Sequence, residues 1–562
     1  MAASSPAGNA KRASFMHRLL ILAGSGWLAC LLGGLAPQTR AAAPARRPVN
    51  GRALFATSQH CMACHNGLTT AGGEDVSIGV AWRATMMANS SRDPYWQASV
   101  RRETVDHPGA AAAIEHECSN CHMPMSHTAA HASGRPAKVF AHLPVTGPQD
   151  EESRLAHDGV SCTLCHQITP QALGTPASFT GGYVIDTSIP VEQRPVYGPF
   201  AVDKGLQRVM HSATGFQQAE GAHLRQSEMC ATCHTLYTTA RGPNGEAVGR
   251  FPEQVPFQEW QHSRYAPEQS CQSCHMPAIA PPTPIASVLG RPREGARRHT
   301  FLGGNFFVLR MLNRFRAELG VEAPSGELDE AARVTLAHLR ESTARVTIGR
   351  AAVEDGRLVV DVSVENLAGH KLPTAYPSRR AWIRLTVHDE RGRLVFASGA
   401  LAPGGAIAGN ANDNDPSAFE PHYRQITRPD QVQIYESILA DTAGAVTTGL
   451  LKATRYAKDN RVLPHGFDKA TAGPDIAVHG QARDDADFTA GSDRVQYVVD
   501  LTGAQGALTV ETELLYQPIG FRWADNLRAY RAAETSRFVS YYDSMSAATA
   551  APLARATITV PR

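Results

Sequence analysis

The residues with the clearest chemical signature are ten cysteines, arranged as five Cys-x-x-Cys pairs that are each followed at once by histidine. Along the chain the motifs are Cys61-Cys64-His65, Cys118-Cys121-His122, Cys162-Cys165-His166, Cys230-Cys233-His234 and Cys271-Cys274-His275. Two thiols on one helical turn can bond both vinyl groups of a haem, and the adjacent imidazole then points at the iron. The pattern predicts five covalently attached c-type haems, with the cysteines as anchors and the five histidines as proximal iron ligands.

Two other uses of paired cysteines are zinc binding and disulfide formation. A zinc knuckle takes two pairs for each metal ion, so five pairs is an odd number for that arrangement. Neither zinc nor disulfides need a histidine after every second cysteine. Haem attachment is the reading that explains all fifteen residues.

Five haems with two histidine ligands each need five more histidines, and eighteen of the 23 histidines lie outside the motifs. We select distal ligands by their distance along the chain from the motifs and by their surroundings. The selected residues are His127, His211, His223, His299 and His370. Met86 and Met87 are alternative axial ligands, because a thioether can replace an imidazole.

The chain begins with a segment typical of export. Lys11, Arg12 and Arg18 precede an apolar run and a group of small residues, which predicts a signal peptide over 1–41. An uncleaved anchor and lipidation of Cys30 are the alternatives. Cleavage would remove the odd eleventh cysteine and change the formal net charge from +2 to −2. We expect a periplasmic or extracellular protein with no membrane span in the mature chain.

Composition and pattern divide the rest of the chain. Residues 42–50 are a linker, and 51–300 are rich in loops, as expected where porphyrins replace an apolar core. Apolar residues at helical spacing predict a helical segment over 301–344. From 345 to 562 the alternation of apolar and polar residues predicts a β-sandwich-like domain with a C-terminal helical insertion. The fold class is therefore multidomain, with a mainly helical, loop-rich first part and a mainly β second part.

Within the β part, alternating residues predict strands over 358–364, 381–387, 495–501 and 507–516, and a last strand over 556–560. The stretch 523–547 is expected to be helical. Asn412–Asp415 is expected to be a solvated acidic loop, with a Ca²⁺ site as the alternative.

The motif region resembles the multihaem cytochrome c family related to the tetrahaem cytochrome c of ammonia oxidisers. The resemblance is carried by 158–166, 227–234 and 273–277, and by a β-domain motif at 369–374 and 377–382. It implies closely stacked haems, mostly with two histidine ligands, and electron transfer; His370 as a ligand also rests mainly on it. The family includes enzymes that convert nitrite and hydroxylamine, but no motif here ends in Lys, as the catalytic haem of the nitrite reductases does.

The expected function is electron transfer between periplasmic or extracellular redox proteins through five haems. No nucleotide-binding motif or catalytic triad competes with it, and the near-neutral charge gives no indication of a nucleic-acid partner. One alternative is an oxidoreductase that acts on a small nitrogen or sulfur compound at an open haem. The other is a subunit of an extracellular cytochrome filament.

Overall fold

Short helices joined by long loops form the first part of the chain in the computed structural model, which describes residues 54–562 except 148 and 243. The predicted signal peptide and linker lie outside the described residues. The helices are α1 (Ser58–Met62), α2 (Ile78–Arg83), α3 (Pro94–Asp106), α4 (Ala111–His122), α5 (Pro124–Ala132), α6 (Glu151–His157), α7 (Cys162–Cys165), α8 (Lys204–Thr214), α9 (Ser227–His234), α10 (Pro256–Gln261) and α11 (Cys271–His275). None of the helices within this described part of the chain is both long and apolar enough to cross a membrane.

Three two-stranded sheets lie among these helices. They pair β1 (Pro195–Gly198) with β2 (Gln217–Glu220), β3 (Leu236–Arg241) with β4 (Ala247–Gln254), and β5 (Thr283–Pro284) with β6 (Pro292–Arg293). The β3–β4 pair is antiparallel and packs close to the second cysteine motif, so it contributes side chains to that site.

Within residues 301–344 the structure has two helices, α12 (Phe306–Arg314) and α13 (Ser325–Ser342), which pack against each other. Phe306, Phe307 and Leu312 are fully buried. The apolar stripe read from the sequence is therefore the core-facing side of α12, as the helical period requires.

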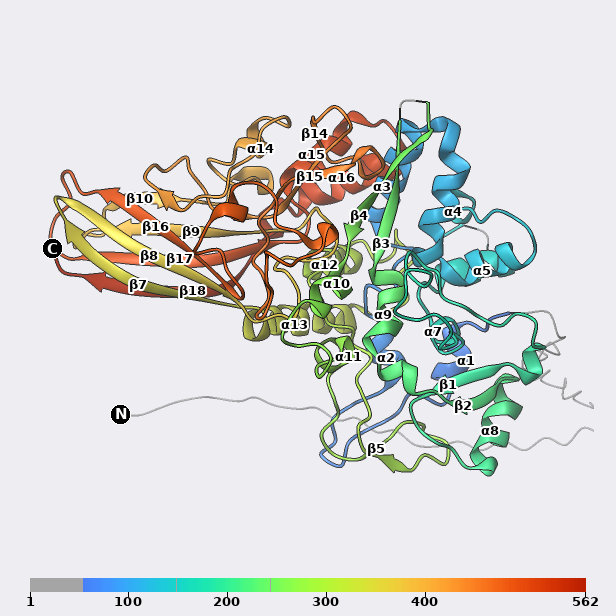
Figure 1. Cartoon of the computed structure of the whole chain (residues 1–562). Coiled ribbons are helices and arrows are strands. Elements are labelled where there is room, and N and C mark those ends of the chain that lie inside the picture. Colours follow the sequence, from blue (N-terminus) through green and yellow to red (C-terminus); the bar gives the residue numbers. More distant parts are fainter. Residues whose placement is uncertain (1–53, 148, 243) are drawn as a thin grey trace, which may run out of the picture. The chain divides into compact units, whose positions relative to one another are not determined.

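Two larger sheets make up the second part of the chain (Figure 1). The first has the order β10–β9–β17–β18, with β12 also paired to β9, and the second has the order β11–β16–β8–β7. The strands are β7 (Ala344–Glu354), β8 (Arg357–Asn366), β9 (Arg380–His388), β10 (Leu394–Ser398), β11 (Gln425–Ile426), β12 (Ile434–Tyr435), β16 (Ser492–Asp500), β17 (Leu508–Gln517) and β18 (Ala551–Val560). A smaller sheet joins β13 (Ser437–Ala440) to β14 (Val446–Thr447) and β15 (Arg455–Asp459).

The alternation read from the sequence sets which side of each strand is buried. On β8, Leu358, Val360, Val362 and Val364 are fully buried, while the residues between them are half-buried. Both larger sheets contribute to one apolar core, and the edge strands β7 and β18 lie beside each other. The mixed helical and β organisation is thus confirmed, while the sandwich-like packing and the domain boundaries stay predictions.

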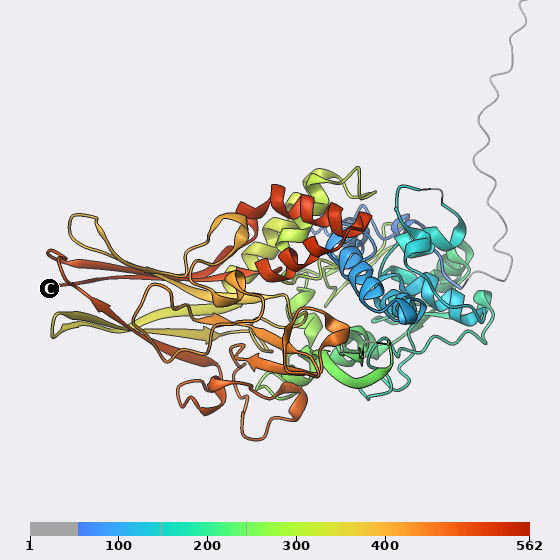
Figure 2. The ribbon, with the colours of Figure 1, turned by 90° about the horizontal axis from the view of Figure 1, so that it is seen from above.

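The same core joins the two halves of the sequence. The described residues from 54 onward belong to one compact unit, in which the core includes Ala84 and Tyr95 from the first part together with residues of both sheets. Helix α3 packs against α16 (Ala533–Ser544), and Figure 2 shows these helices side by side. Arg101 of α3 forms an ion pair with Glu534 of α16 at 2.8 Å.

One local prediction for the β part is corrected. Asn412–Asp415 is not a solvated loop, because it overlaps the short helix α14 (Ala411–Asn414) and Asp413 is buried in an ion pair with Arg380 at 2.8 Å. Pairing of Asp413 with a buried arginine accounts for this difference, since a buried charge must be paired. The stretch 523–547 is largely helical and is divided between α15 (Phe521–Asp525), a 3₁₀ turn and α16.

Candidate functional site

Each cysteine motif lies on or at the end of a short helix. Four motifs lie in or at the end of α4, α7, α9 and α11. The first begins in α1 at Cys61, and the backbone amide of His65 still bonds the Cys61 carbonyl at 3.0 Å. Helical backbone places the two thiols of each motif on one face of the turn. This is the geometry that attachment of one porphyrin through two thioethers requires.

Cysteines of different motifs lie near one another. The thiols close enough to shift each other's pKa are Cys61 with Cys162, Cys121 with Cys233, and Cys230 with Cys271. All ten are free cysteines, so these pairs are not disulfides. The three pairs join the first motif to the third, the second to the fourth, and the fourth to the fifth. The five motifs therefore converge on one region.

Several motif histidines bond a backbone oxygen through the same ring nitrogen, Nδ1. The Nδ1 atoms of His65 and His166 lie 2.6 Å from the backbone oxygens of Ile285 and Tyr197. His275 Nδ1 also bonds a backbone oxygen, that of Leu302. A carbonyl oxygen only accepts, so Nδ1 carries the hydrogen and Nε2 keeps its lone pair. Metal-binding histidines are oriented in the same way by a partner on the second ring nitrogen.

Two of the selected distal histidines face motif histidines. The ring centres of His275 and His370 are 6.2 Å apart, and those of His166 and His299 are 6.5 Å apart. Two imidazoles on opposite sides of one metal have ring centres about 6 Å apart, because each metal–nitrogen bond is about 2 Å long. The Nδ1 atoms of His299 and His370 bond the backbone oxygens of Arg297 at 3.2 Å and Lys371 at 3.0 Å.

Loss of hydration favours the neutral form of these histidines, which is the form that binds a metal. It lowers the pKa of His299 and His370, which are half-buried, to about 4. It also lowers the pKa of His166 and His275, although the bond to a backbone oxygen acts in the opposite sense. At neutral pH these imidazoles therefore carry no charge, so no proton has to be displaced when a metal binds.

The other three selected histidines are not seen facing a motif histidine. His127 lies 4.4 Å from His116, ring centre to ring centre, and its Nδ1 bonds the Ser119 hydroxyl at 3.1 Å. His223 uses Nε2 to donate to the Ile168 oxygen at 2.9 Å. His211 lies in α8, which packs on α1 of the first motif, but Nδ1 is 3.3 Å from both the Phe216 oxygen and the Gln217 amide. Their roles as ligands stay predictions.

Sequence reasoning missed two residues of this region. The His338 ring in α13 is 6.0 Å from the His275 ring, at an angle of 61°. Arg379 is near enough to His234, His275 and His370 to lower the pKa of each. Arg379 belongs to the 377–382 motif that carries the family resemblance, whereas His338 gives no signal beyond its place in an amphipathic helix.

A buried charge network holds the segment that contains His370. Lys371 Nζ contacts Asp459 at 2.7 Å, and Arg461 contacts both Asp459 at 2.8 Å and Glu259 at 2.9 Å. The Glu259 carboxylate also accepts from the backbone amide of Lys371 at 3.1 Å. Since Glu259 belongs to α10 and Asp459 to β15, both parts of the chain fix the position of His370.

The structure offers little support for zinc binding by the paired cysteines. Among residues 54–562, apart from 148 and 243, the one group of three or more side chains that could converge on a metal ion is His422, Asp485 and Asp493, and it contains no cysteine. His422 Nε2 lies 3.1 Å from Asp485, and its Nδ1 accepts from the side-chain amides of Gln433 and Asn460. This tautomer places the hydrogen on Nε2, so His422 acts as a hydrogen-bond donor to Asp485.

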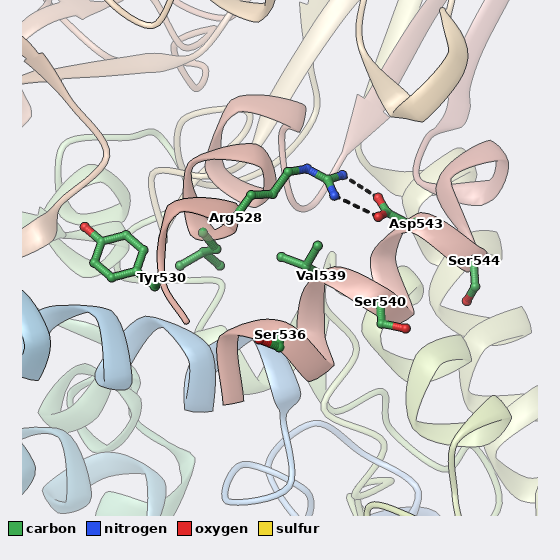
Figure 3. Close-up of a pocket in the computed structure, with 8 residues that line it drawn as sticks. Arg528, Tyr530, Ser536, Val539, Ser540, Asp543 and Ser544 are labelled. Carbon is green, nitrogen blue, oxygen red and sulfur yellow. Dashed lines mark hydrogen bonds and ion pairs between the residues drawn. The ribbon is translucent and has the colours of Figure 1, made fainter. Parts of the chain in front are cut away.

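A surface pocket elsewhere in the structure has a different chemistry. It has a volume of about 710 Å³ and lies beside α16, where Arg528 and Asp543 form an ion pair (Figure 3). Its lining residues are Leu527, Arg528, Tyr530, Ser536, Val539, Ser540, Asp543 and Ser544. None of them is a cysteine or histidine, so this pocket does not belong to the motif region.

Comparison with known proteins identifies the fold. No family model and no curated protein matches the chain. Among solved structures, the fold is similar to that of a penta-haem cytochrome c552 from Thermochromatium tepidum, with a TM-score of 0.50 and 16% sequence identity. The similarity covers 90% of this chain and 100% of that chain. The fold is thus that of a multihaem cytochrome c.

Proposed function

We propose that the chain binds five c-type haems covalently and transfers single electrons. The observation that carries the proposal is the pairing of motif histidines with distal histidines at the spacing of two ligands on one metal, 6.2 Å for His275 and His370. When bound, each haem supplies an iron that alternates between its oxidised and reduced states. The chain supplies the cysteine anchors and the imidazoles that bind the iron.

The proximity of the motifs supports a continuous route for electrons. Cys61 lies close enough to Cys162, and Cys165 close enough to Cys230, to shift the partner's pKa, which relates the first, third and fourth motifs. Cys230 acts on Cys271 of the fifth motif in the same way, and Cys121 of the second motif acts on Cys233 of the fourth. The order is therefore first, third, fourth and fifth, with the second as a branch at the fourth.

The distal ligands are assigned from the same geometry. His299 serves the third motif and His370 the fifth, since each faces the motif histidine with Nε2 free. His211 serves the first motif, because α8 packs on α1. His127 and His223 remain the candidates for the second and fourth motifs, although His223 engages Nε2 with a backbone oxygen.

The cellular setting follows from the chemistry of the proposed cofactor. Five haems on a protein exported by the signal peptide 1–41 would receive and pass on electrons among periplasmic or extracellular redox proteins. The family of the tetrahaem cytochrome c of ammonia oxidisers remains the best description of the motif region, on the stretches 158–166, 227–234 and 273–277.

Counting the covalent haems tests the proposal directly. The intact mass of the purified, denatured protein should exceed that of the mature polypeptide by five haems. The double substitution Cys271→Ser with Cys274→Ser should remove one haem, and the same change at any other motif should also remove one. A protein that takes up no covalent haem in a host that matures c-type cytochromes would refute the proposal.

A second function is favoured by one observation at the second motif. Within the described residues, the histidine rings found facing motif histidines at such spacing belong to the third and fifth motifs, whereas the His122 ring stacks on Trp96 at 4.4 Å. An iron there with one open position would react with small nitrogen or sulfur compounds. A high-spin spectral component that shifts on addition of nitrite or hydroxylamine would support this function, and exclusively low-spin iron would contradict it.

A further inference from the structure

A hydrogen-bonded loop covers the first motif. The loop 285–291 joins β5 to β6, and the Ile285 oxygen accepts from His65 Nδ1 at 2.6 Å. Two residues further on, the backbone amide and the hydroxyl of Ser287 donate to the Cys64 carbonyl at 2.8 Å and 3.0 Å. These bonds fix the loop against the second anchor cysteine of this motif.

The tip of the loop is apolar and exposed. Val288 is 45% exposed and Leu289 is 66% exposed. Single apolar side chains are common on protein surfaces and need no explanation. Two adjacent ones, on a loop that is bonded to a cofactor motif, are a candidate contact for another molecule.

The backbone of the tip is held in one unusual conformation. Leu289 has a φ of +52°, in the left-handed region that a leucine rarely adopts. A Cβ added at Gly290 would lie 1.8 Å from the Ala286 oxygen, so the loop folds back on itself and only glycine fits there. Strain of this kind persists where the surrounding structure enforces it, and it is concentrated at functional sites. The loop therefore presents Leu289 to solvent at a conformational cost.

Arginine side chains lie beside the tip. Arg291 is exposed and follows Leu289 by two residues. Arg293 donates from Nη1 to the Ala201 oxygen at 2.9 Å, which joins the hairpin to the segment before α8. The guanidinium carbons of Arg225 and Arg293 lie 5.1 Å and 5.5 Å from the centre of the Phe200 ring. The three arginines thus belong to one surface with the loop.

The charge of this surface is positive. Lys204, exposed at the start of α8, adds a fourth cation, and the acids on the same segments are Asp203 and Glu294. Arg298 pairs with Glu74 at 2.8 Å, whereas no ion pair among the described residues involves any of the four cations. An apolar centre with a charged rim is the organisation of protein–protein interfaces, and a positive rim selects an acidic partner.

We propose that the tip Val288–Leu289 and these four cations form the docking surface for an acidic redox protein, which exchanges single electrons at the first motif. This inference rests on the proposed function and names the partner by its chemistry. One electron passes between the two proteins, so that one centre is oxidised and the other reduced, and no covalent bond forms or breaks. The bonds to Cys64 favour a redox protein over an anionic membrane, because a membrane surface gains nothing from lying next to a haem anchor.

Calorimetric titration of the haem-loaded protein with an acidic plant-type ferredoxin tests this surface. Leu289→Asn keeps a residue that tolerates the left-handed backbone, and it should weaken binding about tenfold, as expected for an anchor near the centre of an interface. Arg291→Gln should weaken binding at low salt and reduce its dependence on ionic strength. Leu394→Asn and Arg391→Gln are the matched controls, an exposed leucine and an exposed arginine of the β9–β10 hairpin, and they should leave binding unchanged.

Carbodiimide cross-linking locates the contact without relying on electron transfer. This reagent couples lysine amines directly to carboxyl groups, so Lys204 should be joined to the ferredoxin. Lys138, which is exposed on a different segment, should not be joined. Cross-links at Lys138 and none at Lys204 would overturn the inference.

The two proposals fail in distinguishable ways. A protein without covalent haem refutes the proposed function. A fully loaded protein that does not bind the ferredoxin at low salt, or that binds it equally well as Leu289→Asn and Arg291→Gln variants, refutes the docking surface alone. Co-sedimentation with phosphatidylglycerol vesicles that is lost in Leu289→Asn, without ferredoxin binding, would assign the tip to a membrane and would also overturn the inference.

Discussion

His275 and His370 face each other with ring centres 6.2 Å apart and ring planes within 13°, although they come from opposite parts of the chain. His370 directly follows Gly369 in the segment after β8, and the Asn366 side chain donates to its backbone oxygen at 2.8 Å. Lys371, the next residue, is held by Glu259 and Asp459. The β part of the chain therefore brings an imidazole to the fifth motif.

Replacement of His370 tests this relationship. His370→Ala should convert about one fifth of the iron from low spin to high spin, since one of five haems loses its sixth ligand. Electron paramagnetic resonance of the oxidised protein measures the fraction. His338→Ala is the matched control, because this ring is also near His275 but lies at 61° to it. A high-spin signal in the control and not in His370→Ala would reverse the assignment.

The buried pair of Lys371 and Asp459 should contribute strongly to stability. Both side chains are 0% exposed, and Asp459→Asn would leave Lys371 and part of the Arg461 charge without a counter-charge. We expect a loss of about 3–5 kcal/mol in the free energy of unfolding. Urea titrations followed by circular dichroism measure it.

Asp487→Asn provides the comparison for that loss. Asp487 pairs with Arg494 at 2.7 Å, but the two side chains are 47% and 52% exposed. Solvent screens such a pair, so the expected loss is below about 1 kcal/mol. Equal losses in the two variants would show that the buried network does not stabilise the fold as proposed.

The free energy of unfolding should depend on pH through the ionisation of Asp493. Burial raises the pKa of this carboxyl from 3.8 to about 7, and its Oδ1 atom has no hydrogen-bond partner. The unfolded chain releases this proton near pH 4, while the folded chain keeps it to about pH 7, so the folded state binds more protons between these values. The contribution of Asp493 to stability is therefore lost as pH rises from about 4 to 7.

Asp493→Asn removes this ionisation while keeping an oxygen for Tyr435 and the Gln433 amide, which bond Oδ2 at 2.8 Å and 3.2 Å. We expect the variant to lose less stability than the unmodified protein between pH 4 and pH 8. The groups around Asp493 that also titrate are His422, Asp485, Tyr435 and Tyr497. Thermal melting at several pH values provides the measurement, and parallel pH profiles would contradict the expectation.

The sequence predicts the features of this protein that are local. The thioether anchors and the proximal ligand of a c-type haem lie within five consecutive residues, so their spacing alone identifies them. Alternation on 358–364 likewise identifies β8, because the period of two decides which side of a strand is buried.

Features that depend on tertiary contacts cannot be predicted from local sequence patterns. His299 and His370 can be selected from the sequence, but the motif that each one faces depends on how the chain folds back. His338 is missed because helical periodicity identifies the buried side of α13 and not the residue it contacts. The burial of Asp413 is missed for the same reason, since its partner Arg380 lies on β9, distant in the sequence.

Substitution of His299 by methionine tests the third motif. His299→Met should keep six ligands on this iron but raise the potential of one haem, because a thioether ligand favours the reduced state more than imidazole does. His223→Met is the matched comparison, because both histidines lie near His166. His223 donates from Nε2 to the Ile168 oxygen, whereas His299 uses Nδ1 for its hydrogen bond and keeps Nε2 free. Potentiometric titration should therefore show a raised potential at the third-motif haem for His299→Met and an unchanged potential at that haem for His223→Met. A raised potential at the third-motif haem for His223→Met alone would assign that histidine, and not His299, to the third motif.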